Sequence, residues 1–442
     1  MNTQLAAARG ADQYQRILPA VILIALLLAT YATFSGGTLR HLLVRVQTEH
    51  WAQIIVQPSL LWAMMGFALL GFRTLLWLRY RPFASVDPAA APMLTVIIPA
   101  YNEGPMVEKA IDSVASARYP HGCLEIFVVD DGSRDDTWEY IQRAALRQPE
   151  LITAVRFAQN QGKRAALAAG FRRARGAVVV TIDSDSVIEP DTLLAIVGPF
   201  RDPKVGAVAG RVAVYNRFQG LIPRMLRVRF SLAFDFLRAT ESMYRTVYCC
   251  PGALAGYRTA VVRKVLGWWE NQTFLGAVCS FGEDRALTNC ILEEGYDTVY
   301  QRSAVVHTIV PLTYTRLCKM FLRWDRSYVR EELRLARIVW KRPLGPRLIA
   351  IVDKTITNLR YPVSYATLGL IIALSVHEPT AILHLLAAVG MMSMLYMLYY
   401  LRMERSWDFV FGVLYAYYAL FSMFWIFPYA LVTVRARSWL TR

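Results

Sequence analysis

The sequence has few cysteines and few acidic residues for its length. Only six of its 442 residues are cysteines, and no two of them are spaced as a CxxC pair. This pattern excludes a disulfide framework and a zinc site of the usual spacing, and reduced thiols facing the cytoplasm are expected. There are 33 acidic residues against 49 lysines and arginines, a formal net charge of +16. Such an excess suits a membrane surface or an anionic ligand, whereas nucleic acid is excluded by the lack of a recognised binding module.

Charged residues are also scarce, at 19% of the chain against 55% hydrophobic residues. This composition excludes a purely soluble globular protein. Uncharged apolar stretches at 17–34 and 54–72 are each long enough to cross a hydrocarbon layer of about 30 Å as a helix. Three further candidates lie at 361–376, 380–401 and 409–434. We expect two membrane spans followed by three, and not a cleaved signal peptide, because the first stretch is long and a second soon follows.

The arginines beside the first two spans predict which side of the membrane the middle of the chain occupies. Arg9 and Arg16 precede the first span, and Arg73, Arg79 and Arg81 follow the second or lie at its end. The positive-inside rule places these residues, and the domain after them, in the cytoplasm. We therefore expect a multi-pass protein of the inner (plasma) membrane. Five spans would leave the C-terminal arginines outside, so the side of the C-terminus stays open.

The composition divides the chain into three parts. Residues 1–82 form an N-terminal tail with two spans, 83–343 a cytoplasmic domain, and 344–442 a C-terminal membrane region of about three helices. Two helices of the middle part, at about 221–239 and 314–342, combine apolar residues with arginines and are expected to lie in the membrane interface. For the first of them, a buried core helix with a basic edge is the alternative.

Three apolar runs of the middle part end in polar or acidic residues. They cover 94–103, 124–133 and 177–185, and helical patterns at 106–117 and 135–147 fill the intervals. This alternation predicts an α/β sheet with buried parallel strands that deliver side chains to a site at their carboxyl ends. Each acidic strand end also has a structural explanation, because Asp and Ser are good turn and cap residues.

Asp183 and Asp185 are the most informative of these acids. They stand at positions i and i+2 beyond an apolar strand, so they project in the same direction and can hold a hard divalent cation through oxygen. Mg²⁺ or Mn²⁺ bound there would bridge a diphosphate and neutralise charge on a departing nucleotide diphosphate.

Seven short motifs follow one another in an order that resembles the inverting family 2 glycosyltransferases. Within that family, the chain is most similar to the membrane-embedded synthases of hyaluronan, chitin, chitin oligosaccharides and cellulose, and the resemblance spans roughly residues 55–435. The motifs are Pro-Ala-Tyr-Asn-Glu at 99–103, Asp-Asp-Gly-Ser at 130–133, Asn-Gln-Gly-Lys at 160–163, Asp-Ser-Asp at 183–185, Gly-Ala-Leu-Ala-Gly-Tyr-Arg at 252–258, Gly-Glu-Asp at 282–284 and Arg-Trp at 323–324. The resemblance implies a nucleotide-sugar-binding domain of the GT-A type inserted between transmembrane helices.

The resemblance also implies the roles of individual residues. It makes Asp284 the base that takes a proton from the acceptor hydroxyl in a single inverting displacement; its alternative role is a carboxylate at the start of a helix. It makes Asp185 the residue that holds the metal, with Asp183 beside the donor. The other implied contacts are Tyr101, Glu103 and Asp130 around the uridine, Lys163 near the nucleotide, Arg323 on the diphosphate and Trp324 under a sugar ring.

Residues 280–289 and 323–331 are most similar to the hyaluronan and chitin-oligosaccharide branch. The implied donor is UDP-N-acetylglucosamine, with or without a second UDP-sugar, and the implied acceptor is a growing β-linked glycan. Met320 departs from the family pattern, which has Gln there, and this leaves processivity open. The alternatives are a transferase that adds one sugar to a lipid carrier, a glucan synthase that uses UDP-glucose, and a non-enzymatic membrane scaffold. Accessory export subunits cannot be predicted from the sequence.

Overall fold

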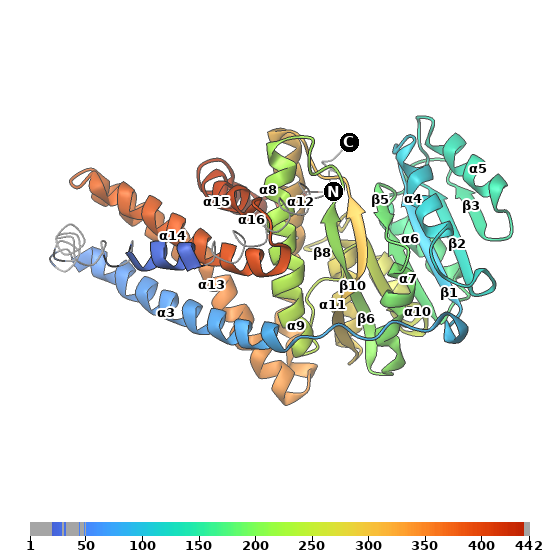
Figure 1. Cartoon of the computed structure of the whole chain (residues 1–442), viewed down its shortest axis with the longest axis horizontal. Coiled ribbons are helices and arrows are strands. Elements are labelled where there is room, and N and C mark those ends of the chain that lie inside the picture. Colours follow the sequence, from blue (N-terminus) through green and yellow to red (C-terminus); the bar gives the residue numbers. More distant parts are fainter. Residues whose placement is uncertain (1–19, 29–30, 32–43, 45–47, 49, 437–442) are drawn as a thin grey trace, which may run out of the picture. The chain divides into compact units, whose positions relative to one another are not determined.

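The computed structural model describes residues 20–28, 31, 44, 48 and 50–436, and the chain divides into two compact units (Figure 1). One unit comprises Met1–Leu75 with Ile351–Phe424. The other comprises Leu76–Ala350 with the segment from Trp425 onward, and it contains the α/β domain. The predicted span at 17–34 lies in large part outside the described residues.

An eight-stranded sheet forms the centre of the second unit. Its strand order is β3-β2-β1-β4-β7-β6-β10-β5, and a two-stranded hairpin, β8-β9, stands apart. The first four strands in this order are parallel, and β7 joins β4 to β6 by antiparallel pairs on both sides. The bounds are β1 Leu94–Ala100, β2 Leu124–Asp130, β3 Ile152–Arg156, β4 Val178–Ile182, β5 Ser186–Ile188, β6 Val205–Val214, β7 Leu254–Arg258, β8 Thr273–Phe274, β9 Ala277–Val278 and β10 Asp297–Thr308.

The N-terminal half of the sheet confirms the predicted alternation of strands and helices. Every residue of β1, β2 and β4 is buried, as expected for parallel strands covered on both faces. The helices between them are α4 Met106–Ala115, α5 Thr137–Arg147 and α6 Lys163–Arg173. At Gly170, α6 comes so close to β1 that an added Cβ would lie 2.7 Å from Ile97 Cγ2.

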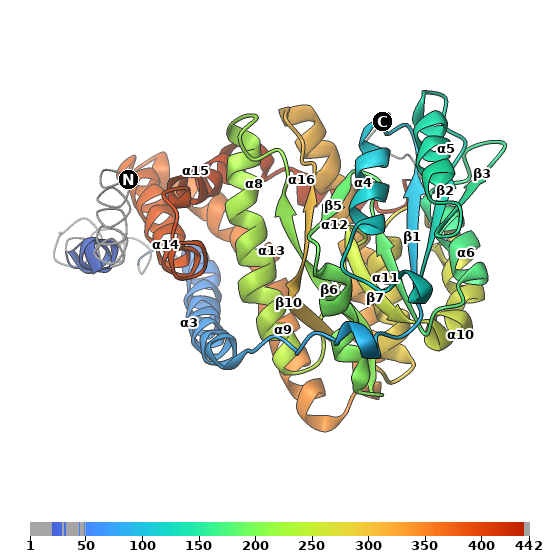
Figure 2. The same ribbon diagram turned by 45° about the vertical axis from the view of Figure 1, so that its right-hand side comes forward.

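The C-terminal half of the unit adds further helices. They are α7 Thr192–Val197, α8 Leu221–Ser231, the π-helical segment η4 Leu232–Arg238, α9 Ala239–Met243, α10 Thr259–Glu270, α11 Glu283–Glu293 and α12 Tyr314–Ile338. Most of these helices contact β6 or β10, while α10 contacts β7 and α12 contacts α11. Figure 2 shows α8 running alongside the sheet. Met225, Leu226 and Val228 of α8 are fully buried. The predicted interfacial helix therefore has a buried face, as in the core-helix alternative, and contact of its other face with lipid stays a prediction.

Within the described residues, two helices are long and apolar enough to cross a membrane, Val56–Arg79 and Thr380–Glu404. They correspond to the predicted spans at 54–72 and 380–401. A third span is possible at the bent helix pair Phe409–Met423 and Ile426–Val432. These two helices meet at 47° and would have to form one broken span. The predicted span at 361–376 is not among them, because helix α13 (Leu344–Ser375) ends at Ser375 and has polar and charged residues before the apolar part. The predicted number of five spans is therefore not reached in this part of the chain.

Candidate active site

The loops after β1 and β2 are joined by hydrogen bonds at the carboxyl edge of the sheet. The backbone N–H of Asn102, which has a left-handed φ of 53°, donates to Ser133 Oγ at 3.0 Å. The backbone N–H groups of Glu103 and Gly104 both donate to Thr137 Oγ1, at 2.8 and 2.9 Å. These bonds hold the 101–103 segment, predicted to contact uridine, against the start of α5.

Asp130, the last residue of β2, is completely buried in this structure. The sheet register pairs it with Arg156 at the end of β3, and Arg156 Nε lies 3.1 Å from Asp130 Oδ2. Asp130 Oδ1 accepts from the backbone N–H of Ser133 at 3.1 Å. Arg156 also lines an open hollow of about 540 Å³ between the 132–134 and 156–160 loops. Arg156 thus contacts both the hollow and Asp130, while contact of Asp130 with a base stays a prediction.

Asp131 is a structural residue of the site that sequence reasoning missed. Its carboxylate accepts from Asn160 Nδ2 at 2.9 Å and from the backbone N–H groups of Gln161 and Gly162 at 2.7 and 2.8 Å. Burial raises the pKa of Asp131, against the effect of these two backbone bonds. The second acid of the Asp-Asp-Gly-Ser motif therefore fixes the loop that begins α6.

Lys163, the first residue of α6, lies among three carboxylates from other parts of the sequence. Its Nζ donates to Asp183 Oδ1 and is 3.3 Å from Glu283 Oε1. Burial by itself lowers the pKa of Lys163, but the charges of Asp183, Glu283 and Asp284 outweigh it and raise the pKa above its ordinary value. Gly252 lies next to the Lys163 amine, because a Cβ added to this glycine would be 2.8 Å from Lys163 Nζ.

Glu283 and Asp284 begin helix α11, so the helix-start role considered for Asp284 is observed together with a place in this cluster. Asp284 Oδ2 accepts from the backbone N–H of Gly252 at 3.3 Å and lies 3.7 Å from Cys249 Sγ. Nothing local in the sequence links Cys249 to an acid 35 positions away. Burial, and then Asp284, raise the pKa of the Cys249 thiol to about 12.

The two adjacent acids have opposite electrostatic surroundings. Burial and the charge of Glu283 raise the pKa of Asp284, and Lys163 only partly offsets them. Burial also acts to raise the pKa of Glu283, but the cations around it, Lys163 first, lower it overall. Environments that separate the pKa values of two neighbouring carboxyl groups are typical of acid–base sites. Lys163 thus favours the charged form of Glu283, whereas burial and the charge of Glu283 favour the protonated form of Asp284.

Asp183 and Asp185 supply the carboxylates at the end of β4. Asp185 Oδ1 accepts from Thr308 Oγ1 at 3.2 Å and from Ser186 Oγ at 3.1 Å. No group of three or more His, Cys, Asp or Glu side chains that could hold a metal occurs among the described residues. Two carboxylates nevertheless fit Mg²⁺, which proteins commonly bind through one or two carboxylates together with substrate phosphates.

Helix α12 brings the predicted Arg-Trp pair to the same region. Arg323 is one of the cations whose charge lowers the pKa of Glu283. The Trp324 ring lies 6.3 Å from the Phe230 ring of α8 and 5.4 Å from that of Phe321, and it stays 37% exposed. Met320, at the family Gln position, is buried. A polar contact from this position is therefore absent, while the exposed Trp324 face is available.

A Rossmann-like curled sheet with a partly buried lysine and several carboxylates at its carboxyl edge defines a GT-A glycosyltransferase domain. The family model described as glycosyl transferase family 2 matches residues 95–266. An N-acetylglucosaminyltransferase of Rhizobium meliloti (strain 1021) is 31% identical over 389 residues, covering 86% of this chain and 90% of the relative. The chain belongs to glycosyltransferase family 2, and it is an enzyme of that class.

Other relatives match over a shorter length. An N-acetylglucosaminyltransferase of Rhizobium leguminosarum bv. viciae is 35% identical over 57% of this chain and 59% of its own length. The hyaluronan synthase of Streptococcus pyogenes is 34% identical over 57% of this chain and 60% of its own length. These matches thus span about three fifths of each relative. Among solved structures, a mannosyltransferase of Pyrobaculum calidifontis in complex with GDP-Man and Mn²⁺ covers 82% of this chain and 99% of its own, with a TM-score of 0.59 and 24% identity, which supports the fold.

Proposed function

We propose that the protein transfers N-acetylglucosamine from UDP-N-acetylglucosamine to a growing β-linked polysaccharide or oligosaccharide. The names of the R. meliloti and S. pyogenes relatives support this choice of sugar and product. The observation that carries the proposal is the cluster in which Lys163 pairs with Asp183 and Glu283 while Asp284 faces the Cys249–Gly252 loop. This cluster supports a site in which a lysine can meet a diphosphate and a nearby carboxylate can take a hydroxyl proton.

In the proposed reaction, Asp284 removes the proton of the acceptor hydroxyl. The acceptor oxygen forms a bond to the anomeric carbon of the donor sugar from the face opposite the leaving group. The bond from that carbon to the diphosphate oxygen breaks with its electron pair on oxygen, and UDP leaves. One displacement of this kind inverts the anomeric configuration. Lys163 and Arg323 stabilise the charge on the diphosphate, and Trp324 packs under a sugar ring of the acceptor.

For the donor, we infer that Tyr101, Glu103 and Asp130 contact the uridine. An aromatic ring stacks on uracil, and a carboxylate accepts from its N–H group. In the structure Asp130 is covered by Arg156 and Ser133, so this contact requires a shift of one of them when the nucleotide binds.

We infer that Asp185, with Asp183 beside it, holds Mg²⁺ or Mn²⁺ against the diphosphate. The metal supplies Lewis-acid stabilisation of the leaving group when bound. We expect Asp185→Asn to remove most turnover of the UDP-sugar and to weaken its dependence on divalent metal, measured as UDP release during metal titration. Full wild-type activity in excess chelator would contradict this assignment.

We further infer a multi-pass protein of the inner (plasma) membrane with its catalytic domain in the cytoplasm. The apolar helices of the first unit support contact with the bilayer, and a membrane-bound synthase of this kind is expected to export its product. The deciding experiment incubates the purified protein with single UDP-sugars and with pairs, sizes the product, and digests it with linkage-specific hydrolases. Polymer formed from UDP-N-acetylglucosamine, alone or with a second UDP-sugar, supports the proposal. Transfer of one sugar to a lipid carrier, or polymer from UDP-glucose, contradicts it.

A further inference from the structure

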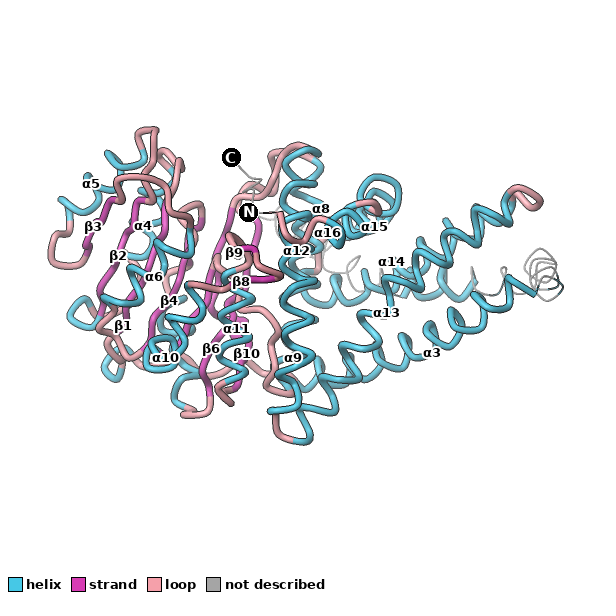
Figure 3. The backbone as a smooth tube through the Cα atoms, turned by 180° about the vertical axis from the view of Figure 1, so that it is seen from behind, coloured by secondary structure: helices cyan, strands magenta, loops and turns pink. Residues whose placement is uncertain are grey.

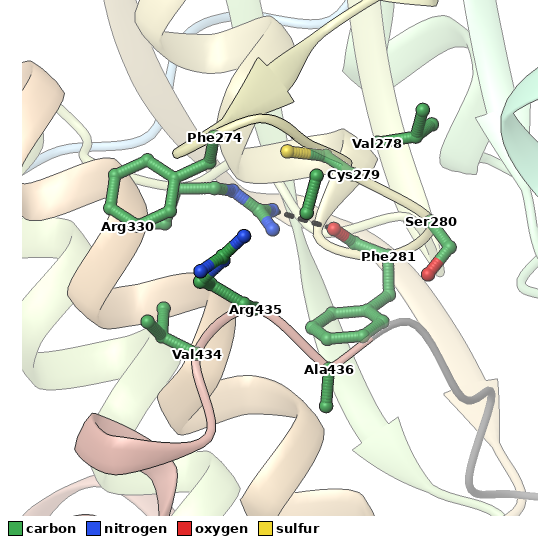
Figure 4. Close-up of a pocket in the computed structure, with 10 residues that line it drawn as sticks. Phe274, Val278, Cys279, Ser280, Phe281, Arg330, Val434, Arg435 and Ala436 are labelled. Carbon is green, nitrogen blue, oxygen red and sulfur yellow. Dashed lines mark hydrogen bonds between the residues drawn. The ribbon is translucent and has the colours of Figure 1, made fainter.

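Two buried residues of α12 hold the segment that leads into Asp284. Arg330 and Glu331 have 4% and 1% exposure. Arg330 Nη2 donates to the backbone carbonyl of Phe281 at 2.6 Å, and its Nε donates to Glu331 Oε1 at 2.9 Å. Figure 4 shows the Arg330 guanidinium directed at the Phe281 carbonyl. The guanidinium therefore fixes the backbone three residues before Asp284.

Glu331 extends this network to both sides of the segment. Its Oε1 accepts from Gln272 Nε2 at 2.7 Å, and its Oε2 accepts from Asn289 Nδ2 at 3.0 Å. Gln272 precedes the β8-β9 hairpin, which is seen near α11 and α12 in Figure 3, and Asn289 lies on α11 itself. One carboxylate thus connects α12 to the elements before and after the Gly-Glu-Asp motif.

The backbone at Gly282 is confined from the same side. Gly282 has a left-handed φ of 75°, and an added Cβ would lie 2.4 Å from Ser327 Cβ and 2.8 Å from Arg330 Nη2. Trp269 Nε1, near the end of α10, donates to the backbone carbonyl of Glu283 at 2.8 Å. The start of α11 is therefore held by both α12 and the end of α10.

A buried ion pair contributes little net stability, because the cost of removing two charges from water offsets their attraction. Its hydrogen bonds nevertheless have fixed directions, so such a pair can fix geometry. In this network the bonds to Phe281 and Asn289 end just before the proposed base and on the helix that it begins, and the bond to Gln272 ends before the β8-β9 hairpin that leads into that segment.

We propose that Arg330 and Glu331, here called the α12 clamp, are positioning residues that hold Asp284 in reach of the acceptor hydroxyl without touching substrate. The inference rests on the proposed role of Asp284 as the base. Because Arg323 and Trp324 lie on the same helix about two turns earlier, α12 holds the base and the sugar platform at a fixed distance from each other. Misplacement of a reacting group by about 1 Å can cost about 10²-fold in rate.

The test compares variants of the full-length protein for kcat, donor KM and UDP binding. Arg330→Met removes the bond to Phe281, Glu331→Gln weakens the links to both flanks, and Arg330→Lys keeps the charge with a single donor group. Arg342→Met is the matched control. Arg342 is also buried and donates to the carbonyls of Tyr296 and Arg245 and to Asp297, but away from the motif.

We expect Arg330→Met and Glu331→Gln to lower kcat about 10- to 100-fold while donor KM and UDP binding stay within twofold. Arg330→Lys should recover part of the loss. The acid limb of the kcat–pH profile should move to lower pH, because a released Asp284 is better hydrated and farther from Glu283. The other charged or titratable groups facing Asp284 include Lys163, Arg285, Cys249, Cys250 and Tyr257. Arg342→Met should change only the fraction of protein that is folded. When kcat is calculated per molecule that binds UDP, its value and its pH profile should equal those of the wild type.

The outcomes separate the clamp from the base assignment. If Asp284→Asn abolishes transfer while Arg330→Met and Glu331→Gln keep wild-type kcat, the clamp is wrong and the base assignment stands. If Asp284→Asn stays active, both are wrong. If Arg330→Met does not bind UDP, its kcat is not interpretable, and the kcat values of Arg330→Lys and Glu331→Gln test the clamp instead. An equal loss of kcat per UDP-binding site in Arg342→Met overturns the proposal.

Discussion

Glu283 and Asp284 are neighbours in sequence, yet Lys163 contacts the first and the Gly252 backbone contacts the second. We expect Asp284→Asn to lower kcat by about 10² to 10⁴ while UDP binding stays near the wild-type value, because only the general base is lost. Glu283→Gln should instead weaken donor binding, since Lys163 loses a partner. Calorimetry with UDP and steady-state kinetics separate the two effects. Near-normal transfer by Asp284→Asn with abolished transfer by Glu283→Gln would assign the base to the other acid.

The same pair predicts a pH dependence. The base works only when it is deprotonated, so kcat falls as the pH drops through the pKa of Asp284. Burial and Glu283 raise that pKa, so the acid limb should lie above the ordinary aspartate value of about 3.9. Glu283→Gln removes a nearby negative charge and should move the limb to lower pH. A limb that does not move in this variant would contradict the coupling.

A side chain at Gly252 would displace the Lys163 amine. A Cβ there would lie 2.8 Å from Lys163 Nζ and 3.4 Å from Asp183 Oδ1, so we expect Gly252→Ala to disturb the lysine and raise donor KM at least tenfold. Gly267→Ala is the control, because a Cβ at this helical glycine meets nothing within 4 Å. Equal donor KM in both variants would show that the Lys163 position does not matter for the donor.

Local patterns predicted some residues of the site and could not predict others. The motif after β4 contains Asp183 and Asp185, and the motif at the start of α6 contains Lys163. Cys249 and Gly252 reach Asp284 only through tertiary structure, and the burial of Asp130 depends on Arg156 from the next strand. Contacts of this kind have no local signal in the sequence.

At the scale of elements, the start of α11 depends on one left-handed glycine. Gly282→Ala combines an unfavourable φ, costing about 1–2 kcal/mol, with a clash against α12, so both the unfolding temperature and kcat should fall. Gly295, with a φ of 87° and nothing within 4 Å of an added Cβ, provides the control. Gly295→Ala bears the strain alone and should keep its kcat. Thermal unfolding and kinetics on both proteins check this, and an unchanged kcat in Gly282→Ala would contradict it.

The elements themselves were predictable to different degrees. β1, β2 and β4 are buried, largely apolar runs, and helices α4 and α5 were predicted within a few residues. Strand β3 and helix α6 were not predicted. The sequence leaves two environments open for helix α8, because apolar residues around most of a helix suit both a protein core and a membrane interface; the structure shows one buried face, and lipid contact of the other stays a prediction. The insertion of β7 between β4 and β6 depends on pairing between distant segments, which periodicity does not report.

At the scale of the whole molecule, the charge pattern predicts a cytoplasmic catalytic domain. Arg73 forms an ion pair with Asp353 at 2.7 Å, so Arg79 and Arg81 contribute most of the free positive charge after that span. A reporter inserted in the loop after Asp202 should therefore read cytoplasmic. A reporter inserted at the same place in an Arg79→Glu/Arg81→Glu variant should show a mixed orientation. An external signal from the wild-type insertion would require a different membrane assignment.

The strand order has a consequence for synthesis on the ribosome. One edge of β4 pairs with β1, but the other edge pairs with β7, which follows about 75 residues later. At about 5 to 20 residues per second, roughly 4 to 15 s pass before β7 is made. During that time the half-sheet that carries the nucleotide motifs exposes an open strand edge, which invites pairing with other chains. Shielding of this edge until Leu254–Arg258 emerges would therefore protect a nascent chain of this protein from such pairing.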